Sequence, residues 1–209
     1  MKNLDSGRRV FFVLIQLIMS HAVLLSQAPT MPDGYIQDIT DHQYHYKKEL
    51  VAIIKDDTAY VSFYSIQPSY RLVARYQGTR NEPVFNMGTS SGKSKQAQKI
   101  GLVKFIIDSK EYELSAYQLL QLRANPEQQD LFFIPFTDAT SGSETYMAGR
   151  YLDFKLTDIK DGSLLIDFNK AYNPYCAFVD GYNCPIPPPA NQLNVAIRAG
   201  EKSYGKKWK

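Results

Sequence analysis

The stretch Lys99–Ala116, KIGLVKFIIDSKEYELSA, carries the pattern that decides the fold class. Its first part, Lys99–Asp108, is apolar on both faces, which is typical of a strand in the middle of a sheet. Glu111–Ala116 alternates between polar and apolar residues and predicts a strand with one buried face. Short strands separated by turn residues predict a mainly β fold, an antiparallel β-barrel or sandwich. Similar patterns recur at Tyr70–Gln77, Leu131–Phe136 and Leu193–Ala199.

One helix is expected before these strands. Asp41–Lys55 (DHQYHYKKELVAIIK) begins with a residue type that favours the N-cap position and continues with good helix formers. The preceding segment, Gln27–Tyr35, contains Pro and Gly and is interpreted as a linker. We therefore expect a linker and one N-terminal helix over 27–56, and a β domain over 57–209. Apolar side chains lie at helical spacing at Tyr46, Leu50, Ile53 and Ile54.

The N-terminus resembles a secretory signal peptide. Lys2, Arg8 and Arg9 precede Val10–Leu25, an almost unbroken apolar run of 16 residues. A retained membrane anchor is the alternative, but the run is shorter than the roughly 20 apolar residues that cross a bilayer. We expect residues 1–26 to be removed after Ser26, leaving no stable membrane span; cleavage after Ala28 is the alternative, but Pro29 would follow it directly. The protein would then be exported to the periplasm or the extracellular space.

Length and charge narrow the function classes. The chain is 44% hydrophobic and 22% charged, which is a globular balance rather than that of a disordered protein. Without the leader, 183 residues remain, which suits one domain. The formal net charge of +3 for the whole chain gives no electrostatic reason to expect nucleic acid as a partner.

The two cysteines, Cys176 and Cys184, are eight positions apart in a chain expected to be exported. Oxidising compartments favour disulfides, so a bond between them is expected. Free thiols and a metal site remain alternatives. Zinc needs four ligands, and the other soft ligands outside the leader are His42 and His45, so no metal site is predicted.

A hairpin is predicted between Arg150–Ile159 and Ser163–Phe168. A three-residue loop with a left-handed Gly162 would separate apolar from polar side chains, because a slip of one residue inverts every side chain. This register places Phe154 opposite Phe168 and Lys155 opposite Asp167. It gathers one polar face from Asp153, Asp167 and Asn169.

The segment Gly88–Ser94 (GTSSGKS) is similar to a phosphate-binding loop but has Met87 where that motif needs its first Gly. We expect a glycine-rich hairpin loop here and no nucleotide. Motifs of serine hydrolases, zinc peptidases and dinucleotide-binding proteins do not occur in the sequence, and nothing in it predicts a cofactor.

Three strings in the last third of the chain resemble those of the family called domain of unknown function 1684. They are PFTDATSGSETYMAGRYLD (Pro135–Asp153), DFNKAYNPYCAF (Asp167–Phe178) and CPIPPPANQLNVAIRAGEK (Cys184–Lys202). The resemblance is looser through the middle, and Asp56–Ala59 replaces an expected Ser-Pro-Leu element. It implies a fold and a site, but no reaction. The implied motif positions are Asp138, Glu144, Tyr146, Arg150, Asp153, Asp167, Asn169, Asn173, Cys176, Cys184, Asn191 and Glu201.

Two polar loops flank the predicted hairpin and should lie at the same end of the sheet. One is Asp138–Tyr146, and the other is the long, Pro-rich loop Asn169–Asn191. Together they predict a pocket around Arg150, held by Asp153 or Glu144, for an anion, a polar ligand or an oxygen-coordinated cation. The alternative is that these residues only fix the loops to the sheet. The candidate ligand-binding residues are Asp138, Glu144, Tyr146, Arg150, Asp153, Asp167, Asn169 and Asn173.

Three functions remain open from sequence alone. The first is binding of a small polar or saccharide ligand, which the Tyr-rich composition and the paired polar loops favour. The second is a hydrolase that uses Asp or Glu as acid and base, since carboxylates suffice for glycoside-type chemistry. The third is a structural protein of the cell envelope. Whether the protein is an enzyme is left open.

Overall fold

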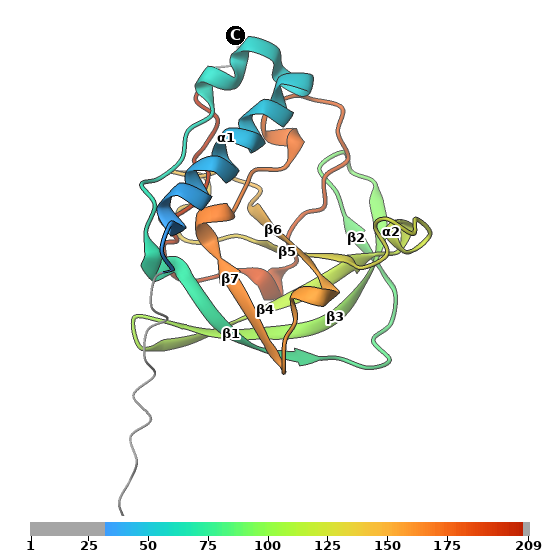
Figure 1. The fold of residues 1–209 in the computed structure, drawn as a ribbon. Coiled ribbons are helices and arrows are strands. Elements are labelled where there is room, and N and C mark those ends of the chain that lie inside the picture. Colours follow the sequence, from blue (N-terminus) through green and yellow to red (C-terminus); the bar gives the residue numbers. More distant parts are fainter. Residues whose placement is uncertain (1–31, 207–209) are drawn as a thin grey trace, which may run out of the picture. The chain divides into compact units, whose positions relative to one another are not determined.

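The computed structural model describes residues 32–206, which begin with a helix and continue as strands (Figure 1). Helix α1 spans Tyr35–Ile54, and a four-residue helix, α2, spans Leu120–Arg123. The strands are β1 (Arg71–Gly78), β2 (Phe85–Gly88), β3 (Ser94–Ile107), β4 (Lys110–Leu119), β5 (Leu131–Phe136), β6 (Arg150–Lys155) and β7 (Ser163–Asp167). Short 3-10 turns cover Lys55–Tyr60, Pro68–Tyr70, Leu156–Asp158, Phe168–Lys170, Tyr175–Ala177 and Pro189–Asn191. The expected class, mainly β with an N-terminal helix, is confirmed.

The strands form one antiparallel sheet in the order β6-β5-β4-β3-β1-β7, with β2 also paired to β3 (Figure 1). The longest pairing is the β3–β4 hairpin, where Val103 lies opposite Leu114. Strands β6 and β7 are the two ends of this order and do not pair with each other. The sheet is therefore an open half-barrel, in keeping with the expected antiparallel β class.

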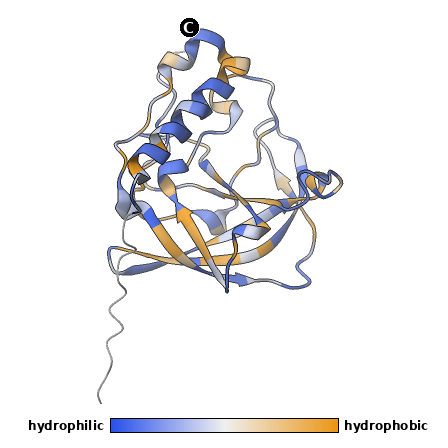
Figure 2. Ribbon diagram, viewed as in Figure 1, coloured by the Kyte–Doolittle hydropathy of each residue, from blue (hydrophilic) through white to orange (hydrophobic). Residues whose placement is uncertain are grey.

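The core fills the concave side of this sheet with aliphatic and aromatic side chains. Phe168 is central, with ring centroids 5.6 Å from Phe105 and 5.3 Å from Phe136. Ile134 on β5 and Ile166 on β7, from opposite halves of the sheet order, belong to the same buried cluster. Each such side chain contributes about 1.5–3 kcal/mol when fully buried. Figure 2 shows hydrophobic residues concentrated in the strands, whereas α1 is mostly hydrophilic.

Helix α1 begins at Tyr35, not at Asp41 as expected. The carboxylate of Asp41 accepts a hydrogen bond from Gln37 Nε2 on the exposed surface and does not cap the helix. Tyr35 and Ile39, one turn apart, are 4% and 1% exposed. Their burial against the β domain stabilises a first turn that N-cap preferences could not reveal.

The predicted hairpin between Arg150–Ile159 and Ser163–Phe168 is wrong. Strand β6 pairs with β5, so Phe154 lies opposite Phe132. Strand β7 pairs with β1, so Asp167 lies opposite Arg71 and not opposite Lys155.

The turn between these strands explains the error. Lys160 and Ser163 exchange backbone hydrogen bonds of 2.9 and 2.7 Å around Asp161-Gly162, which is a two-residue turn rather than the three-residue loop expected. Before it, the 3-10 turn Leu156–Asp158 ends β6, and the side chain of Asp158 accepts from the amide of Lys155. The chain therefore leaves the β6 direction before the turn begins, and β7 forms elsewhere in the sheet.

The alternating segment Leu193–Ala199 is not a strand. Several of its backbone carbonyls accept hydrogen bonds from side chains, where those of a strand would accept from the amides of a neighbouring strand. The carbonyls of Ile197 and Ala199 accept from the Arg150 guanidinium at 2.9 and 2.5 Å, and the carbonyl of Ala196 accepts from the Tyr70 hydroxyl. The polar and apolar residues alternate because one side of this extended segment is buried. One-sided burial also occurs in β-strands, so the pattern alone could not distinguish the two.

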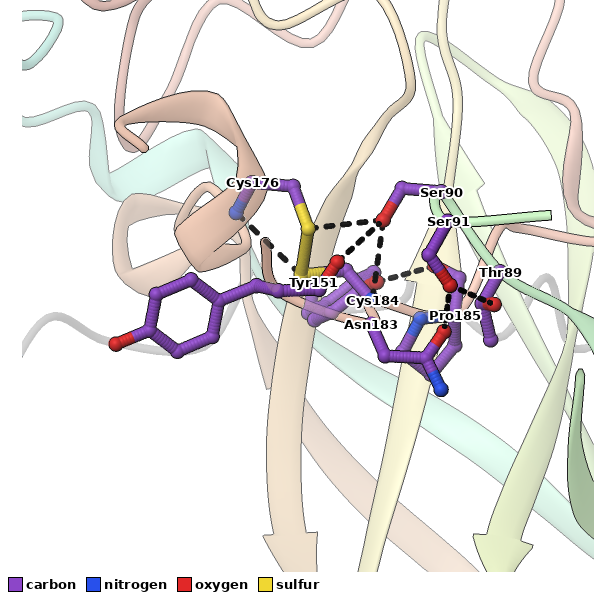
Figure 3. The surroundings of a disulfide bond; sticks show 9 residues. Thr89, Ser90, Ser91, Tyr151, Cys176, Asn183, Cys184 and Pro185 are labelled. Atoms are coloured by element: carbon purple, nitrogen blue, oxygen red, sulfur yellow. Dashed lines mark hydrogen bonds between the residues drawn. A yellow bond between two sulfur atoms is a disulfide. The ribbon is translucent and has the colours of Figure 1, made fainter. Parts of the chain in front are cut away.

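Cys176 and Cys184 are joined by a disulfide (Figure 3). The segment Gly88–Ser94 is the expected hairpin loop, joining β2 to β3. Its Ser90 Oγ lies 2.9 Å from Cys176 Sγ and accepts from the amide of Cys184 at 3.1 Å. The disulfide thus anchors the long Pro-rich loop beside a hairpin that is distant in sequence.

The expected signal peptide, residues 1–26, and most of the linker lie outside the described residues. Within 32–206, no helix is both long enough and apolar enough to span a membrane.

Candidate functional site

A groove of about 700 Å³ lies along α1, where the half-barrel is open between β6 and β7. Because these two edges do not pair, their side chains face the helix across a gap. Helix α1 contributes Tyr35, Asp38, Ile39, His42, Tyr46 and Glu49; β6 and the segment after it contribute Leu152, Asp153, Phe154, Thr157, Asp158 and Lys160. The remaining side is formed by Pro32, Arg71, Leu165, Asp167, Lys170, Tyr172 and Tyr175.

Asp153 is exposed to this groove from β6. Its Oδ2 accepts a hydrogen bond of 2.6 Å from the Tyr172 hydroxyl. Burial between the groove walls raises the pKa of Asp153, and the bond from Tyr172 opposes that shift. Among the ion pairs of residues 32–206, none involves Asp153. This carboxylate is therefore partly desolvated and has no basic partner among residues 32–206.

Three tyrosines surround the same end of the groove. The rings of Tyr46 and Tyr172 are 5.9 Å apart, and Tyr175 is 43% exposed. The hydroxyl of Tyr46 donates to Glu201 Oε2 at 2.9 Å. Since the Tyr172 hydroxyl is bonded to Asp153, both of these hydroxyls have protein acceptors. Both rings line the groove.

Asp167 marks the other end of the groove and is fixed by several donors. The Tyr35 hydroxyl donates to Oδ2 at 2.8 Å, and the Asn169 amide and Nδ2 both donate to Oδ1 at 3.0 Å. The guanidinium of Arg71 lies over the Tyr35 ring, 5.6 Å from its centroid. Burial and the neighbouring Asp167 raise the pKa of Tyr35, so its hydroxyl remains a donor.

His42 and Lys170 add basic groups beside Asp167. Burial lowers the pKa of His42, and the positive charge of Lys170 lowers it further, while Asp167 opposes both. The imidazole is therefore neutral at physiological pH and can accept a hydrogen bond. The groove consequently has an acidic, aromatic end at Asp153 and a mixed, partly basic end at Asp167.

Arg150 lies outside this groove and is completely buried. Its partner is Asp138, at 2.8 Å, so the expected partners Asp153 and Glu144 are wrong. The guanidinium also donates to three backbone carbonyls, those of Ile197, Ala199 and Glu201. No face of Arg150 is open to a ligand. The Asp138–Arg150 pair instead fixes the C-terminal segment to β6.

Asn173 lies beside a second buried carboxylate, Glu201. Glu201 Oε2 accepts from the Asn173 amide at 2.7 Å as well as from Tyr46. Glu201 Oε1 and Asn173 Oδ1 are both buried acceptors without a partner among the described residues. Burial raises the pKa of Glu201 to about 7. A proton on Glu201 would satisfy a buried acceptor that the ionised form leaves unpaired.

The last two candidates, Glu144 and Tyr146, do not line the groove. Glu144 forms a two-pronged ion pair with Arg198, at 2.7 Å for the shortest bond, and accepts from the Tyr64 hydroxyl at 3.0 Å. Hydrogen bonds from Arg198 and Tyr64 lower the pKa of Glu144. Tyr146 is partly buried on the same loop.

The structure thus brings together only part of the predicted site. Asp153 and Asp167 line the two ends of the groove and Asn169 donates to Asp167, whereas the other five candidates form buried or peripheral networks. Sequence reasoning missed the contribution of α1, above all Tyr35 and Tyr46. The helical spacing of Tyr46 with Leu50 was visible, but nothing local indicated that the helix would lie along the open edge of the sheet. No cluster of three His, Cys, Asp or Glu side chains suited to a metal ion occurs between residues 32 and 206.

Comparison with known proteins agrees with this fold and supplies no activity. A family model described as a protein of unknown function (DUF1684) matches residues 56–202. No curated protein matches the chain. A solution NMR structure of an uncharacterized protein of Haloarcula marismortui is similar, with a TM-score of 0.61 and 25% sequence identity, over 82% of this chain and 97% of that one.

Proposed function

The chain belongs to the DUF1684 family of proteins of unknown function, and from its groove we propose that it binds a small polar or saccharide ligand. One observation carries this proposal: a concave site of about 700 Å³, lined by aromatic rings and by fixed polar groups, lies at the open edge of the sheet. Small-molecule sites typically have this size and this combination of apolar surface with a few oriented polar groups.

The polar groups of the groove are held in place before any ligand arrives. Asp167 is fixed by Tyr35 and Asn169, and Asp153 by Tyr172. Pre-ordered acceptors reduce the entropy that binding would otherwise cost. Aromatic rings beside carboxylates suit a sugar, whose C–H face can pack on a ring while its hydroxyls donate to the acids.

An NMR titration of the purified protein tests the proposal. Small neutral saccharides, small organic anions and small organic cations are added separately, and backbone amide shifts are followed. We expect at least one class to shift the amides of Asp153, Tyr172 and Asp167 in a saturable manner. Binding that never perturbs these amides, for any class, would reject the groove as the ligand site.

A blocking variant supplies the matched control. Leu165 is 42% exposed and lines the groove, whereas Val73, directly opposite it on β1, is 60% exposed and lies outside. Leu165→Trp should abolish ligand binding, and Val73→Trp should retain it with the same thermal midpoint as the parent. Equal binding by both variants would contradict the proposal.

A carboxylate-based hydrolase is a second candidate, supported by Asp153. The raised pKa of this groove carboxyl is the property that a general acid needs. Turnover of chromogenic glycosides that disappears in Asp153→Asn but persists in Glu111→Gln, at an exposed position on β4 outside the groove, would support it. If the folded protein binds a sugar but does not hydrolyse it, the hydrolase candidate is rejected and only the binding function remains.

We also propose that the protein works outside the cytoplasm. The basic and apolar leader and the Cys176–Cys184 disulfide both support export. Mass spectrometry of the protein recovered from the periplasm or culture medium should give a mature chain that begins at Gln27. A cytoplasmic chain that retains Met1 and reduced cysteines would overturn this proposal.

A further inference from the structure

The geometry points to an organic ammonium group as the part of the ligand that the Asp153 end of the groove recognises. This inference rests on the proposed binding function and names the ligand chemistry at one end of the same groove. The ligand would place its cationic nitrogen beside the Asp153 carboxylate and against the rings of Tyr46, Tyr172 and Tyr175.

The first argument is the unbalanced charge of Asp153. The carboxylate is exposed to the groove, and among the described residues its one hydrogen-bond donor is the neutral Tyr172 hydroxyl. Across the part of the chain that the structure describes, no Lys or Arg pairs with it. Crowding by the groove walls raises the pKa of Asp153, because it disfavours the charged form. A ligand cation would compensate that effect, whereas an anion would increase it.

The second argument is the aromatic surface around this carboxylate. Tyr46, Tyr172 and Tyr175 all line the groove, and the first two rings are 5.9 Å apart. Because the hydroxyls of Tyr46 and Tyr172 already bond to Glu201 and Asp153, the rings offer the ligand mainly π surface. Cations within about 6 Å of such rings are attracted to their faces, and alkylated ammonium groups are well suited because they need few hydrogen bonds.

The third argument is the distribution of basic groups along the groove. Arg71, His42 and Lys170 lie toward Asp167, where Lys170 acts on the pKa of His42 and Arg71 lies over Tyr35. Arg71 and Lys170 offset the negative charge of Asp167 at that end, so a cation is favoured more at Asp153, with which no basic side chain of residues 32–206 forms an ion pair. A hydrated metal ion would need several oxygen ligands, but no cluster of three potential metal-binding side chains is found in residues 32–206.

The test compares a cation with its neutral counterpart of the same shape. Choline and 3,3-dimethylbutan-1-ol differ in the quaternary nitrogen, which the alcohol replaces with carbon. In an NMR titration at constant ionic strength, choline should shift the amides of Asp153 and Tyr172 and bind at least about tenfold more tightly than the alcohol. Tetramethylammonium should cause the same shifts, whereas an equal concentration of sodium chloride should not.

Two variants assign the effect to this end of the groove. Asp153→Asn keeps an acceptor for Tyr172 but removes the charge, and it should weaken choline binding at least about tenfold. Glu111→Gln removes the same charge from an exposed position on β4 outside the groove and should change affinity less than about twofold. Tyr175→Leu keeps apolar surface without a π face and should also weaken choline binding.

The outcomes separate this inference from the binding function. If choline binds no better than the alcohol, or if Asp153→Asn binds it as well as the parent does, the ammonium assignment is wrong. Saccharides that shift the groove amides when choline does not would overturn the assignment and leave the binding function standing. If neither series shifts those amides, both proposals fail.

Discussion

Arg150 shows at the scale of one residue why a motif position need not touch a ligand. A guanidinium donates in a fixed plane, and here its donors reach one carboxylate and the carbonyls of Ile197, Ala199 and Glu201. Arg150 fills a motif position of the family, and its full burial explains this residue type structurally. Any shorter side chain would leave the Asp138 carboxylate charged and without its ion-pair partner.

Arg150→Ala should therefore destabilise the protein severely. Leaving the buried Asp138 carboxylate without its partner costs about 3–5 kcal/mol, which thermal and urea unfolding would measure. The control is Arg198→Ala, since Arg198 pairs with Glu144 at the exposed surface and should barely move the midpoint. An Arg150→Ala protein as stable as the parent would contradict this account of the network.

Glu201 should make the stability depend on pH near neutrality. Its pKa rises from an ordinary 4.5 to about 7 on folding, so the folded state holds a proton that the unfolded state has lost. The contribution of protonated Glu201 to the free energy of unfolding is complete below pH 4.5, declines as the pH rises toward 7, and is absent above pH 7. The whole effect amounts to about 3 kcal/mol.

Urea unfolding between pH 4.5 and 8 would measure this decline. Glu201→Gln is the matched variant, because its amide can donate to Asn173 Oδ1 and accept from Tyr46 without titrating. That variant should lose most of the slope. A parent protein whose stability rises through this range would show that Glu201 is ionised when folded.

At the scale of elements, the sequence predicted strands well and their partners poorly. Leu131–Phe136 coincides with β5, and the patterns within Lys99–Ala116 became β3 and β4, because burial on one or both faces is a local property of the side chains. Pairing is not local. Strand β7 forms at β1, about 90 residues earlier in the chain, since core volume and sheet curvature decide which edges meet.

The disulfide should stabilise the long loop rather than specify the sheet. Cys176→Ser or Cys184→Ser should lower the free energy of unfolding by about 2–3 kcal/mol and leave the far-UV circular dichroism unchanged. Ser90→Ala, which removes only the hydroxyl beside the sulfurs, is the milder comparison. If either Cys variant loses the β signal in its far-UV circular dichroism, the contact between the disulfide-bonded loop and the Gly88–Ser94 hairpin loop directs strand pairing as well.

At the scale of the whole molecule, the groove lies where three elements that are not neighbours in the sheet, α1, β6 and β7, face one another. Helix α1 comes from the start of the described chain, and β6 and β7 come from opposite ends of the sheet order. The site could not be predicted from sequence because none of the three segments carries a recognisable binding motif by itself. Asp153 and Asp167 share a polar environment only because the sheet stops short of closing.

A ligand in the groove should therefore slow local opening in α1 and β7 together. Hydrogen exchange of the amides of Ile39 and Leu165 should become slower in parallel at saturating ligand, while amides in the β3–β4 hairpin change little. At a ligand concentration of 100 times Kd, the gain in folding free energy is about 2.7 kcal/mol. Protection confined to one side of the groove would mean that the ligand does not bridge the two.

The contact of Arg150 with Ile197, Ala199 and Glu201 has a consequence for synthesis. Translation completes β6 well before the segment that satisfies its buried guanidinium leaves the ribosome. A chain interrupted before Ile197 would keep Asp138 as a partner for Arg150 but lack the three carbonyls that accept from its guanidinium. We expect such a fragment to be less stable than the complete chain and therefore more readily cleaved by proteases.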